Sequence, residues 1–414
     1  MQAVSDRQAP AAAPQPHLGD RGLVALIAFL SAFVPLSTDL YLPALPTMAE
    51  HLKATPSLVN LTLVAFFVCY GIGTLLWGPL SDKHGRRPVL LVGSGLYVLA
   101  SIGCAVSPGI YWLIGSRCLQ AFGGGGVTAV ATAVVKDVYG GRRREAVLAV
   151  VQSMVMIAPI VAPFPGALLL QVTSWRGVFW VLTGVGMGAM LGGLLYRETI
   201  PYREERGVFQ TLGRLGHVLK NPGFSLLLLL FSLLGVAGLA YVASSSYIFQ
   251  DGFGVSEIAF SVYFASNAVF AVLGPLVYMR LSARLPRVTI LTWSFGVFFA
   301  SGLLICLLGG RAPWLFTACL IPATVASGIV RPPGANMMLE QQKQDTGSAS
   351  SLMSCFGILS GSVGILVISQ DWGNRVLALG CLYAVSGLLC SVLWQYARRA
   401  PFVKHPEAVV EETA

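Results

Sequence analysis

Two ionisable residues stand inside long apolar runs, where a charge is costly. Asp39 is the one residue among 18 acidic residues that lies well inside such a run, and Arg117 is the most deeply placed basic residue. Burial favours the protonated form of a carboxyl group, whereas a nearby arginine favours the carboxylate, so this combination suits reversible proton binding. We therefore expect Asp39 and Arg117 to take part in proton coupling. The alternative is a static ion pair that holds two helices together.

The two residues lie at matching depths. Asp39 is seven residues before Pro46, near the outer end of the first apolar run, and Arg117 is seven residues after Ile110, where the fourth run begins. At 1.5 Å of rise per residue, both side chains are about 10 Å below the outer surface. If the two helices are neighbours, the side chains can approach each other.

A charged loop between the second and third runs has the composition of a conformational latch. Two glycines in it permit a tight turn, and an aspartate and two arginines carry charge; these residues are Gly78, Asp82, Gly85, Arg86 and Arg87. Because a helix N-terminus attracts negative charge, we expect Asp82 to contact the N-terminus of the eleventh helix near Ser348 and to hold one side shut. The alternative is an ordinary basic loop, which does not explain the two glycines and the aspartate.

Three prolines crowd the fifth run between Ala158 and Gly166. Each removes a backbone donor and bends or loosens a helix. We expect Pro159, Pro163 and Gly166 to form a hinge or a sealing element, and a passive kink is the alternative.

Polar-tipped residues in the seventh and eighth runs are candidates for lining a cavity. Tyr263 and Asn267 are four residues apart and so share one helix face, and Tyr241 lies in the preceding run. They suit an amphiphilic ligand, but hydrogen bonding between helices explains them equally well. Arg331 lies at the inner end of the tenth run, where reaching the membrane interface explains it adequately.

These residues are positioned by a helical membrane bundle. Hydrophobic residues make up 55% of the chain and charged residues only 11%, whereas soluble domains carry about 25% charged residues. A helical span needs about 20 predominantly apolar residues, and twelve segments qualify. They are residues 22–46, 57–77, 89–107, 110–134, 147–170, 176–196, 223–247, 256–279, 288–309, 313–336, 348–369 and 373–397.

The spans divide into six plus six. The predicted organisation is an N-terminal tail (residues 1–21), a six-helix bundle (22–196), a central loop (197–222), a second six-helix bundle (223–397) and a C-terminal tail (398–414). A weaker copy of the charged loop starts at Gly274, 196 residues after Gly78, which indicates a duplicated bundle. The fold class is therefore all-α, with twelve transmembrane helices in two pseudo-symmetric halves.

The distribution of positive charge predicts the orientation of the bundle. Of 27 basic residues, 21 fall in the tails and alternate loops on one side, four fall on the other side, and two lie within spans. Cytoplasmic loops carry the excess of Lys and Arg, so both termini are predicted to be cytoplasmic. Short loops between spans also argue against a nucleic-acid partner. The eight cysteines fall in apolar runs without metal-ligand spacing, so we predict no metal site.

The motifs resemble those of the major facilitator superfamily, and within it the twelve-span drug:proton antiporters. The loop from Gly78 to Arg87, Arg117 with Gln120, and the stretch from Ala158 to Gly166 are similar to the superfamily's motifs in and around helices two to five. More specifically, the segment Ser37–Pro46 looks like the first helix of the bicyclomycin/chloramphenicol-type efflux subfamily. Trp175–Phe179 and Gly347–Ser350 also fit that subfamily.

The resemblance implies proton-driven export of small amphiphilic compounds across a bacterial inner membrane by a protein that is no enzyme. It implies no cofactor, a monomer in the lipid bilayer, and a substrate cavity that includes Asp39, Tyr41, Arg117 and Gln120. Some multidrug members carry a second acid just before this aspartate, and none occurs from Ser31 to Thr38. A specific metabolite exporter or a proton-coupled importer is the alternative within transporters, and a sensor or a membrane-embedded enzyme is the alternative outside them.

Overall fold

Helices account for the regular structure of residues 15–200, 208–342 and 346–404, which the computed structural model describes. No strand occurs in these three ranges. Twelve of the helical segments in them are long and apolar enough to cross a membrane, which confirms the predicted number of spans. Parts of the predicted tails and central loop (residues 1–14, 201–207 and 405–414) lie outside the described residues.

The first six spans are built from nine α-helices, because the first and fifth spans are each interrupted. Their elements are α1 (Gly19–Ser31), α2 (Phe33–Asp39), the 3₁₀-helix η1 (Leu42–Ala44), α3 (Leu45–His51), α4 (Pro56–His84), α5 (Arg86–Ala105), α6 (Ile110–Val138), α7 (Gly141–Val161), α8 (Pro163–Val172) and α9 (Trp175–Leu195).

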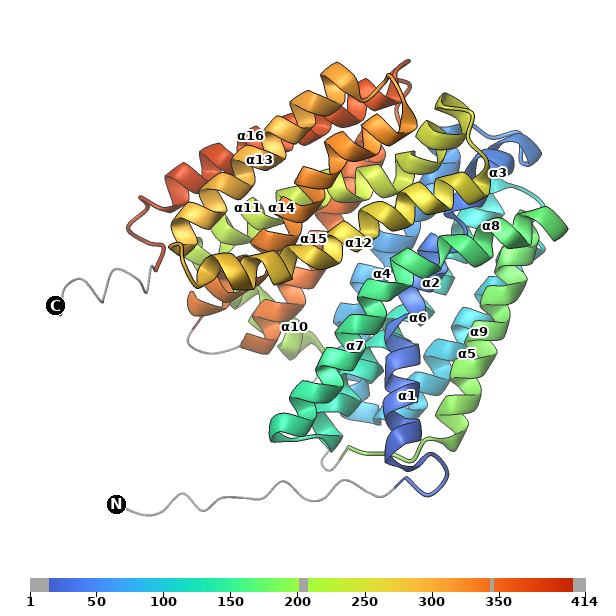
Figure 1. Ribbon diagram of the computed structural model, residues 1–414. Helices are drawn as coiled ribbons and strands as arrows, with labels where there is room; N and C mark the ends of the chain where they lie inside the picture. Colours follow the sequence, from blue (N-terminus) through green and yellow to red (C-terminus); the bar gives the residue numbers. More distant parts are fainter. Residues whose placement is uncertain (1–14, 201–207, 343–345, 405–414) are drawn as a thin grey trace, which may run out of the picture.

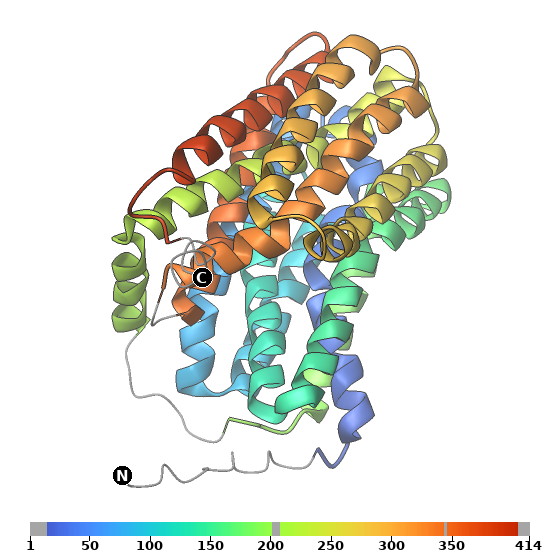
Figure 2. The same ribbon diagram turned by 60° about the vertical axis from the view of Figure 1, so that its left-hand side comes forward.

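The last six spans are more regular. Their elements are α11 (Pro222–Ser246), the π-helical turn η2 (Tyr247–Gly252), α12 (Glu257–Ser282), α13 (Arg287–Leu308), α14 (Pro313–Glu340), α15 (Thr346–Ile368) and α16 (Arg375–Ala397). In Figure 1 and Figure 2 the blue-to-green helices of the first half gather on one side of the molecule and the yellow-to-red helices of the second half on the other.

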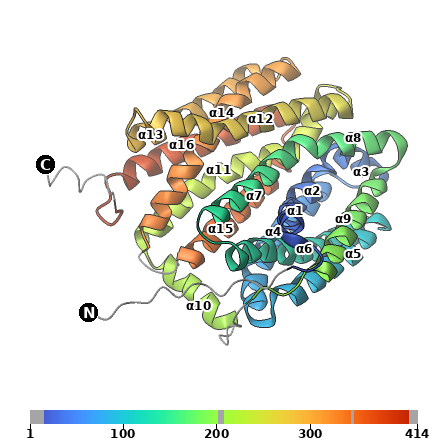
Figure 3. The ribbon, with the colours of Figure 1, turned by 60° about the horizontal axis from the view of Figure 1, so that its bottom comes forward.

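The segment predicted as a central loop contains a further helix, α10 (Val208–Leu219). Apolar residues recur in it at helical spacing, and Val218 is buried, so one face of this short helix packs on the bundle. It contacts α4, α11 and α15 and lies at the edge of the molecule in Figure 3. A span-length search misses this helix because its 12 residues are too few to cross a bilayer.

Glycines let the helices of the first half approach closely. A Cβ on Gly123 would lie 2.6 Å from the carbonyl oxygen of Gly93 on α5, and a Cβ on Gly125 would lie 3.1 Å from the backbone nitrogen of Thr74 on α4. Small residues at helix contacts are the usual means of packing inside a membrane. The four-glycine run Gly123–Gly126 therefore packs α6 against its neighbours, and it resembles a phosphate-binding loop only in composition.

The outer surface of the bundle is apolar. The side chains of Leu99, Met279 and Leu307, for example, are 70%, 68% and 72% exposed. Such side chains are stable in contact with lipid and unstable in contact with water. The chain is therefore a multi-pass membrane protein.

The two halves meet on one side and separate on the other. Asn60 at the start of α4 donates to the hydroxyl of Ser369 after α15 (2.9 Å), Gln250 of η2 donates to the carbonyl of Pro43 (3.1 Å), and Ser57 donates to the carbonyl of Ser369. These contacts lie opposite the side where α1 begins and α16 ends, that is, on the predicted outer side. The ribbons of the two halves converge there, near α3 and α8 in Figure 1.

On the predicted cytoplasmic side the halves are further apart. The packing of α4 on α15 continues inward as far as Gly71, whose Cβ position is 3.7 Å from the sulfur of Cys355. Beyond it, Ser350, Ser351 and Ser354 in the first turns of α15 are exposed. This conformation is sealed on the predicted outer side and open on the predicted cytoplasmic side.

Candidate functional site

The first span breaks immediately after Asp39. Pro43 has no N–H and therefore cannot donate a hydrogen bond to the carbonyl of Asp39. Pro46 likewise cannot donate to the carbonyl of Leu42. The α-helix ends at Asp39 and resumes at Leu45 after the short 3₁₀ turn. The break leaves the carbonyl of Ser37, near the C-terminus of α2, without a backbone partner in the described residues.

Arg117 caps this broken helix end. Its Nη1 donates to the Ser37 carbonyl at 3.1 Å and to Oε1 of Gln120, one turn further along α6, at 2.6 Å. Because a helix C-terminus carries partial negative charge, the guanidinium is stabilised there without a carboxylate. Gln120 in turn donates to the hydroxyl of Ser101 on α5 at 2.7 Å, so three helices share one polar network.

Aromatic rings complete the surroundings of the guanidinium. Its central carbon lies 4.2 Å from the ring centre of Phe66, 4.6 Å from that of Tyr41 and 5.9 Å from that of Phe179. Cation–π contacts of this kind stabilise a desolvated cation by about 2 kcal/mol. The Tyr41 hydroxyl pairs with that of Thr62 at 2.9 Å, which fixes the ring. Nε and Nη2 of Arg117 are buried and have no partner in the described residues, so the group keeps donors to spare.

Asp39 is buried but is not paired with a cation. The Thr38 hydroxyl donates to its Oδ1 at 3.0 Å, and the residue keeps 6% of its surface exposed. The first and fourth spans are neighbours, which is the condition for contact between the two side chains. The structure describes both residues, but no ion pair joins Asp39 to Arg117. The arginine instead reaches the carbonyl two residues before the acid. The static ion pair considered from the sequence is therefore absent from this conformation.

The proline-rich part of the fifth span lies against the Asp39 break and against the other half. The span is interrupted between Val161 and Pro163, within the predicted hinge. A Cβ on Gly166 would lie 2.0 Å from the carbonyl oxygen of Leu40, so only glycine permits this contact. The Pro163 carbonyl accepts a hydrogen bond from Ser261 of α12 at 3.1 Å. This segment thus joins the outer seal, whereas a hinge motion of Pro159, Pro163 and Gly166 stays a prediction.

The charged segment after the second span is more helical than the sequence indicated. α4 continues to His84, and a Cβ on Gly78 would meet nothing within 4 Å, so no tight turn forms there. The turn forms at Gly85, where φ is +104° and a Cβ would lie 2.5 Å from Oε2 of Glu198. Glu198 accepts the backbone N–H groups of Arg86 and Arg87 at 3.1 and 3.0 Å, which caps the N-terminus of α5.

The predicted contact of Asp82 with the eleventh helix does not form in this conformation. Asp82 pairs with Arg86 at 2.6 Å, and no hydrogen bond joins it to the described residues of α15. Arg86 also pairs with Asp137 at the end of α6 (Nε to Oδ2, 2.8 Å), and Arg87 donates to the carbonyl of Leu194. The two halves are apart on this side, so this cluster ties together helices of one half only.

Asp137 and Glu198 are the residues that sequence reasoning missed in this cluster. Asp137 stands near the end of α6 and Glu198 in the segment after α9, outside the apolar runs, so a search for charges deep in the membrane passes over them. The available signal was weak: Asp137 and Arg86 stand just outside the ends of two adjacent predicted spans.

The cavity residues predicted in the second half link its helices. Asn267 accepts a hydrogen bond from Thr324 of α14 at 2.8 Å, the Tyr263 ring stacks on Phe249 at 5.0 Å, and the Tyr241 ring stacks on Phe264 at 5.7 Å. Asn267 and Tyr241 are buried and Tyr263 is half-buried. A role in binding stays a prediction for all three.

No cluster of His, Cys, Asp and Glu side chains in the described residues could hold a metal ion. The chemistry at this site is thus that of one carboxyl group, one spare guanidinium edge, hydroxyl groups and aromatic rings. The carboxyl group can exchange a proton, and the other groups can donate hydrogen bonds to, or stack on, polar or aromatic solutes.

Twelve spans in two halves that close on one side around buried ionisable groups define a membrane transport protein. The profile of the Major Facilitator Superfamily matches residues 27–365, and the chain belongs to that family. The chain is therefore a transporter and not an enzyme.

Relatives with assigned names are similar over most of their length. The chain is 32% identical to the "Chloramphenicol resistance protein" of Pseudomonas aeruginosa over 391 residues, which covers 89% of this chain and 90% of that one. It is 28% identical to the "Multidrug resistance protein MdtL" of Klebsiella pneumoniae, over 87% and 90% of the two chains. Among solved structures, the peptide transporter POT in complex with sulfate has the same fold, with a TM-score of 0.76 at 13% identity, over 97% of this chain and all of that one.

Proposed function

We propose that this transporter exports small amphiphilic compounds, including drugs of the chloramphenicol kind, across a bacterial inner membrane in exchange for protons. The named relatives support the substrate type, since they are a chloramphenicol resistance protein and a multidrug resistance protein. The positive-inside pattern supports cytoplasmic termini. Asp39 is the proton-binding group in this proposal.

The position of Asp39 is the observation that carries the proposal. Its carboxyl group is buried, lacks a cationic partner and stands at the end of α2. The segment that follows touches both the hinge region, through Leu40 against Gly166, and the second half, through Pro43 and Gln250. Protonation of Asp39 therefore changes the charge beside the seal that must open and close.

The proposed cycle has two half-reactions. With the cavity open outward, Asp39 takes a proton from the outer side. The bundle then rocks to the inward-open conformation, where Asp39 releases the proton to the cytoplasm as substrate binds. Nε and Nη2 of Arg117 lack a partner among the described residues but are buried, and in this proposal they donate to acceptor groups of the substrate once the surrounding aromatic rings move aside. The substrate-loaded carrier returns to the outward-open conformation, and Asp82, Arg86 and Arg87 bias the balance between the two conformations.

Proton movement in inside-out vesicles tests this function. Addition of chloramphenicol to energised vesicles with an acidic lumen is expected to release protons from the lumen in the wild type and not in Asp39→Asn. Asp371→Asn is the matched control, because Asp371 is an exposed acid in the loop between α15 and α16. If Asp39→Asn releases protons as the wild type does, Asp39 is not the coupling group. If no drug in a broad panel releases protons from wild-type vesicles, a specific metabolite exporter or a proton-coupled importer becomes the better proposal.

A further inference from the structure

Arg331 lies further from the end of its helix than the sequence indicated. The tenth span was predicted to end at residue 336, but α14 continues through Pro332 and Pro333 to Glu340. Arg331 is therefore nine residues, or about 13 Å, from that end of the helix. The neighbours of Arg331 along α14 show whether its side chain faces lipid or the interior of the bundle.

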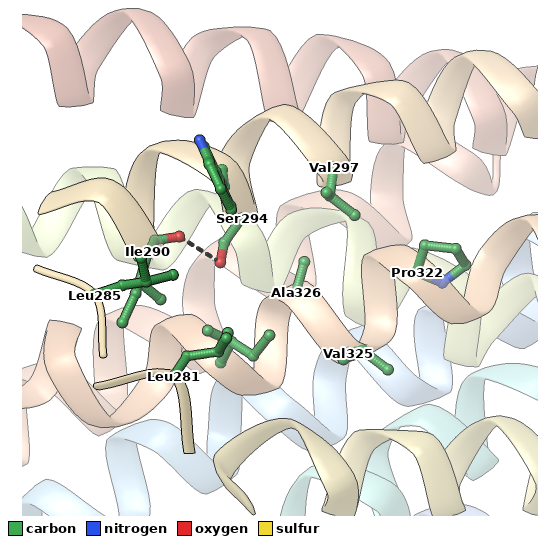
Figure 4. A pocket seen from close by; sticks show the side chains of 10 residues that line it. Leu281, Leu285, Ile290, Ser294, Val297, Pro322, Val325 and Ala326 are labelled. Carbon is green, nitrogen blue, oxygen red and sulfur yellow. Dashed lines mark hydrogen bonds between the residues drawn. The ribbon is translucent and has the colours of Figure 1, made fainter. Parts of the chain in front are cut away.

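The lipid-facing side of α14 is marked by a groove on the surface of the bundle. Pro322, Val325 and Ala326 of α14 line this groove together with residues of α12 and α13 (Figure 4). Trp293, which also lines it, is 63% exposed. Arg331 follows Pro322 by nine residues, or about two and a half helical turns, so it lies on the opposite face of α14, toward the interior of the bundle.

Contacts to other helices confirm that face. Thr324, seven residues before Arg331 and thus about two turns away on the same face, donates to Asn267 of α12. Gly334, three residues after Arg331, packs its Cα on the ring of Phe231 of α11, where a Cβ would be 2.9 Å from the ring. Arg331 therefore lies on the strip of α14 between α11 and α12.

The internal repeat places a pore-facing residue at the equivalent position of the first half. Gly328 of α14 packs on Gly274 of α12 as Gly125 of α6 packs on Gly73 of α4, in each case between the second and fourth spans of a half. In the structure Gly274 therefore corresponds to Gly73, and not to Gly78 as the sequence indicated. Three residues further on stand Arg331 and Thr128, respectively. The Thr128 hydroxyl pairs with that of Tyr70 of α4 at 3.2 Å, so this position belongs to the interior polar surface.

Arg331 is nevertheless exposed, and none of the described residues pairs with it. The acid nearest to it along α14, Glu340, pairs instead with Arg287 at 3.3 Å and accepts a hydrogen bond from Asn336 at 2.7 Å. Because Arg331 faces the interior of the bundle, its exposed side chain is accessible from the predicted cytoplasmic side, where the halves are apart. Deep in the described bundle, two arginines thus accompany a single carboxyl group, that of Asp39.

We propose that Arg331 determines specificity at the cytoplasmic approach to the substrate site: it selects neutral or anionic amphiphiles that carry hydrogen-bond acceptors and excludes organic cations. This inference rests on the proposed export function. A free guanidinium donates charge-assisted hydrogen bonds to carboxylate, nitro or carbonyl oxygens and repels an approaching cation. Since no second acid accompanies Asp39 in α2, the described interior sets one carboxyl group against two guanidinium groups, which leaves the repulsion of a cation dominant.

Binding to the purified protein in detergent tests the proposal without requiring transport. The probes are chloramphenicol, its anionic hemisuccinate ester and the cation tetraphenylphosphonium, which are measured by equilibrium dialysis. The wild type is expected to bind the hemisuccinate at least as tightly as chloramphenicol, and tetraphenylphosphonium at least about tenfold more weakly. Arg331→Gln is expected to weaken hemisuccinate binding by about tenfold or more, and chloramphenicol binding much less.

Two variants and a salt series guard against a folding artefact. Arg331→Lys keeps the charge and is expected to keep the order of affinities, and Arg280→Gln removes an exposed arginine near the end of α12 and is expected to change nothing. In the wild type itself, added salt is expected to weaken hemisuccinate binding and to leave chloramphenicol binding unchanged. This last measurement tests charge-assisted binding of the hemisuccinate even if Arg331→Gln does not fold.

Three results would overturn the proposal: wild-type protein that binds tetraphenylphosphonium as tightly as the hemisuccinate, an Arg331→Gln variant with an unchanged ratio of affinities, or no binding of any probe. The export proposal fails differently. Absence of proton release in vesicles with the affinity order intact contradicts antiport alone, whereas proton release with tight cation binding contradicts the role of Arg331 alone.

Discussion

The packing of α8 on the break in the first span can be tested at a single atom. Gly166→Ala adds one methyl group, which in the present backbone would lie 2.0 Å from the carbonyl oxygen of Leu40. Real Cβ atoms essentially never come closer than 3.0 Å to another heavy atom, so the two segments must separate by at least about 1 Å. Both partners are backbone, and no side chain can move aside to relieve the contact.

The expected cost of this substitution is that of overpacking a close contact, about 1–3 kcal/mol. Because Leu40 directly follows Asp39, the same displacement moves the carboxyl group and the outer seal. We expect Gly166→Ala to lower the melting temperature of the purified protein and to reduce drug-evoked proton release more than it reduces the amount of folded protein.

Gly184→Ala in α9 is the matched control, because a Cβ there would meet nothing within 4 Å. It is expected to melt and transport as the wild type does. Melting is measured by fluorescence-detected size exclusion after heating, and proton release is measured in inside-out vesicles. If Gly166→Ala and Gly184→Ala melt at the same temperature and release protons equally, the close contact is not what positions Asp39, and the reasoning is refuted.

Two further substitutions probe the latch cluster and the outer seal. Asp137→Asn leaves the buried Arg86 with Asp82 as its remaining acid and is expected to destabilise the protein by about 3 kcal/mol. Asp20→Asn breaks the half-exposed pair with Arg143 and is expected to cost under about 1 kcal/mol. Equal losses of stability in thermal unfolding would contradict this difference. Asn60→Ala removes the hydrogen bond to Ser369 in the outer seal, which is worth about 1 kcal/mol. It is expected to speed amide hydrogen exchange at the start of α4 by about fivefold. An unchanged exchange rate there would exclude a sealing role for Asn60.

The twelve spans could be predicted because each is a local property of the sequence. A run of about 20 apolar residues has to form a helix in a bilayer, whatever its neighbours are. The interruption of the fifth span was equally local, since prolines remove backbone donors. The helix α10 was missed because it lies on the bundle rather than through it.

The pairing of the charged groups could not be predicted, because it depends on contacts between helices. The sequence places Asp39 and Arg117 at one depth, but the choice of partner follows from the break at Pro43, which exposes the Ser37 carbonyl to the arginine. Asp82 illustrates a different limit. Its predicted contact with the eleventh helix depends on how close the two halves are, and a sequence does not say which conformation is populated.

Arg331 shows how a small error in a helix end changes a functional interpretation. With the span ended at residue 336, the arginine is close to the helix end and needs no role. In the structure α14 extends to Glu340, and Arg331 is about 13 Å before that end, exposed and without a partner among the described residues.

The central claim is that Asp39 releases a proton when substrate binds from the cytoplasmic side. Titration calorimetry of the purified protein with chloramphenicol, in buffers of different ionisation enthalpy from pH 6 to 8, measures the number of protons released per substrate bound. The account predicts that the wild type and Asp371→Asn release up to about one proton, and that Asp39→Asn binds the drug and releases none. Equal proton release by Asp39→Asn and the wild type would contradict it.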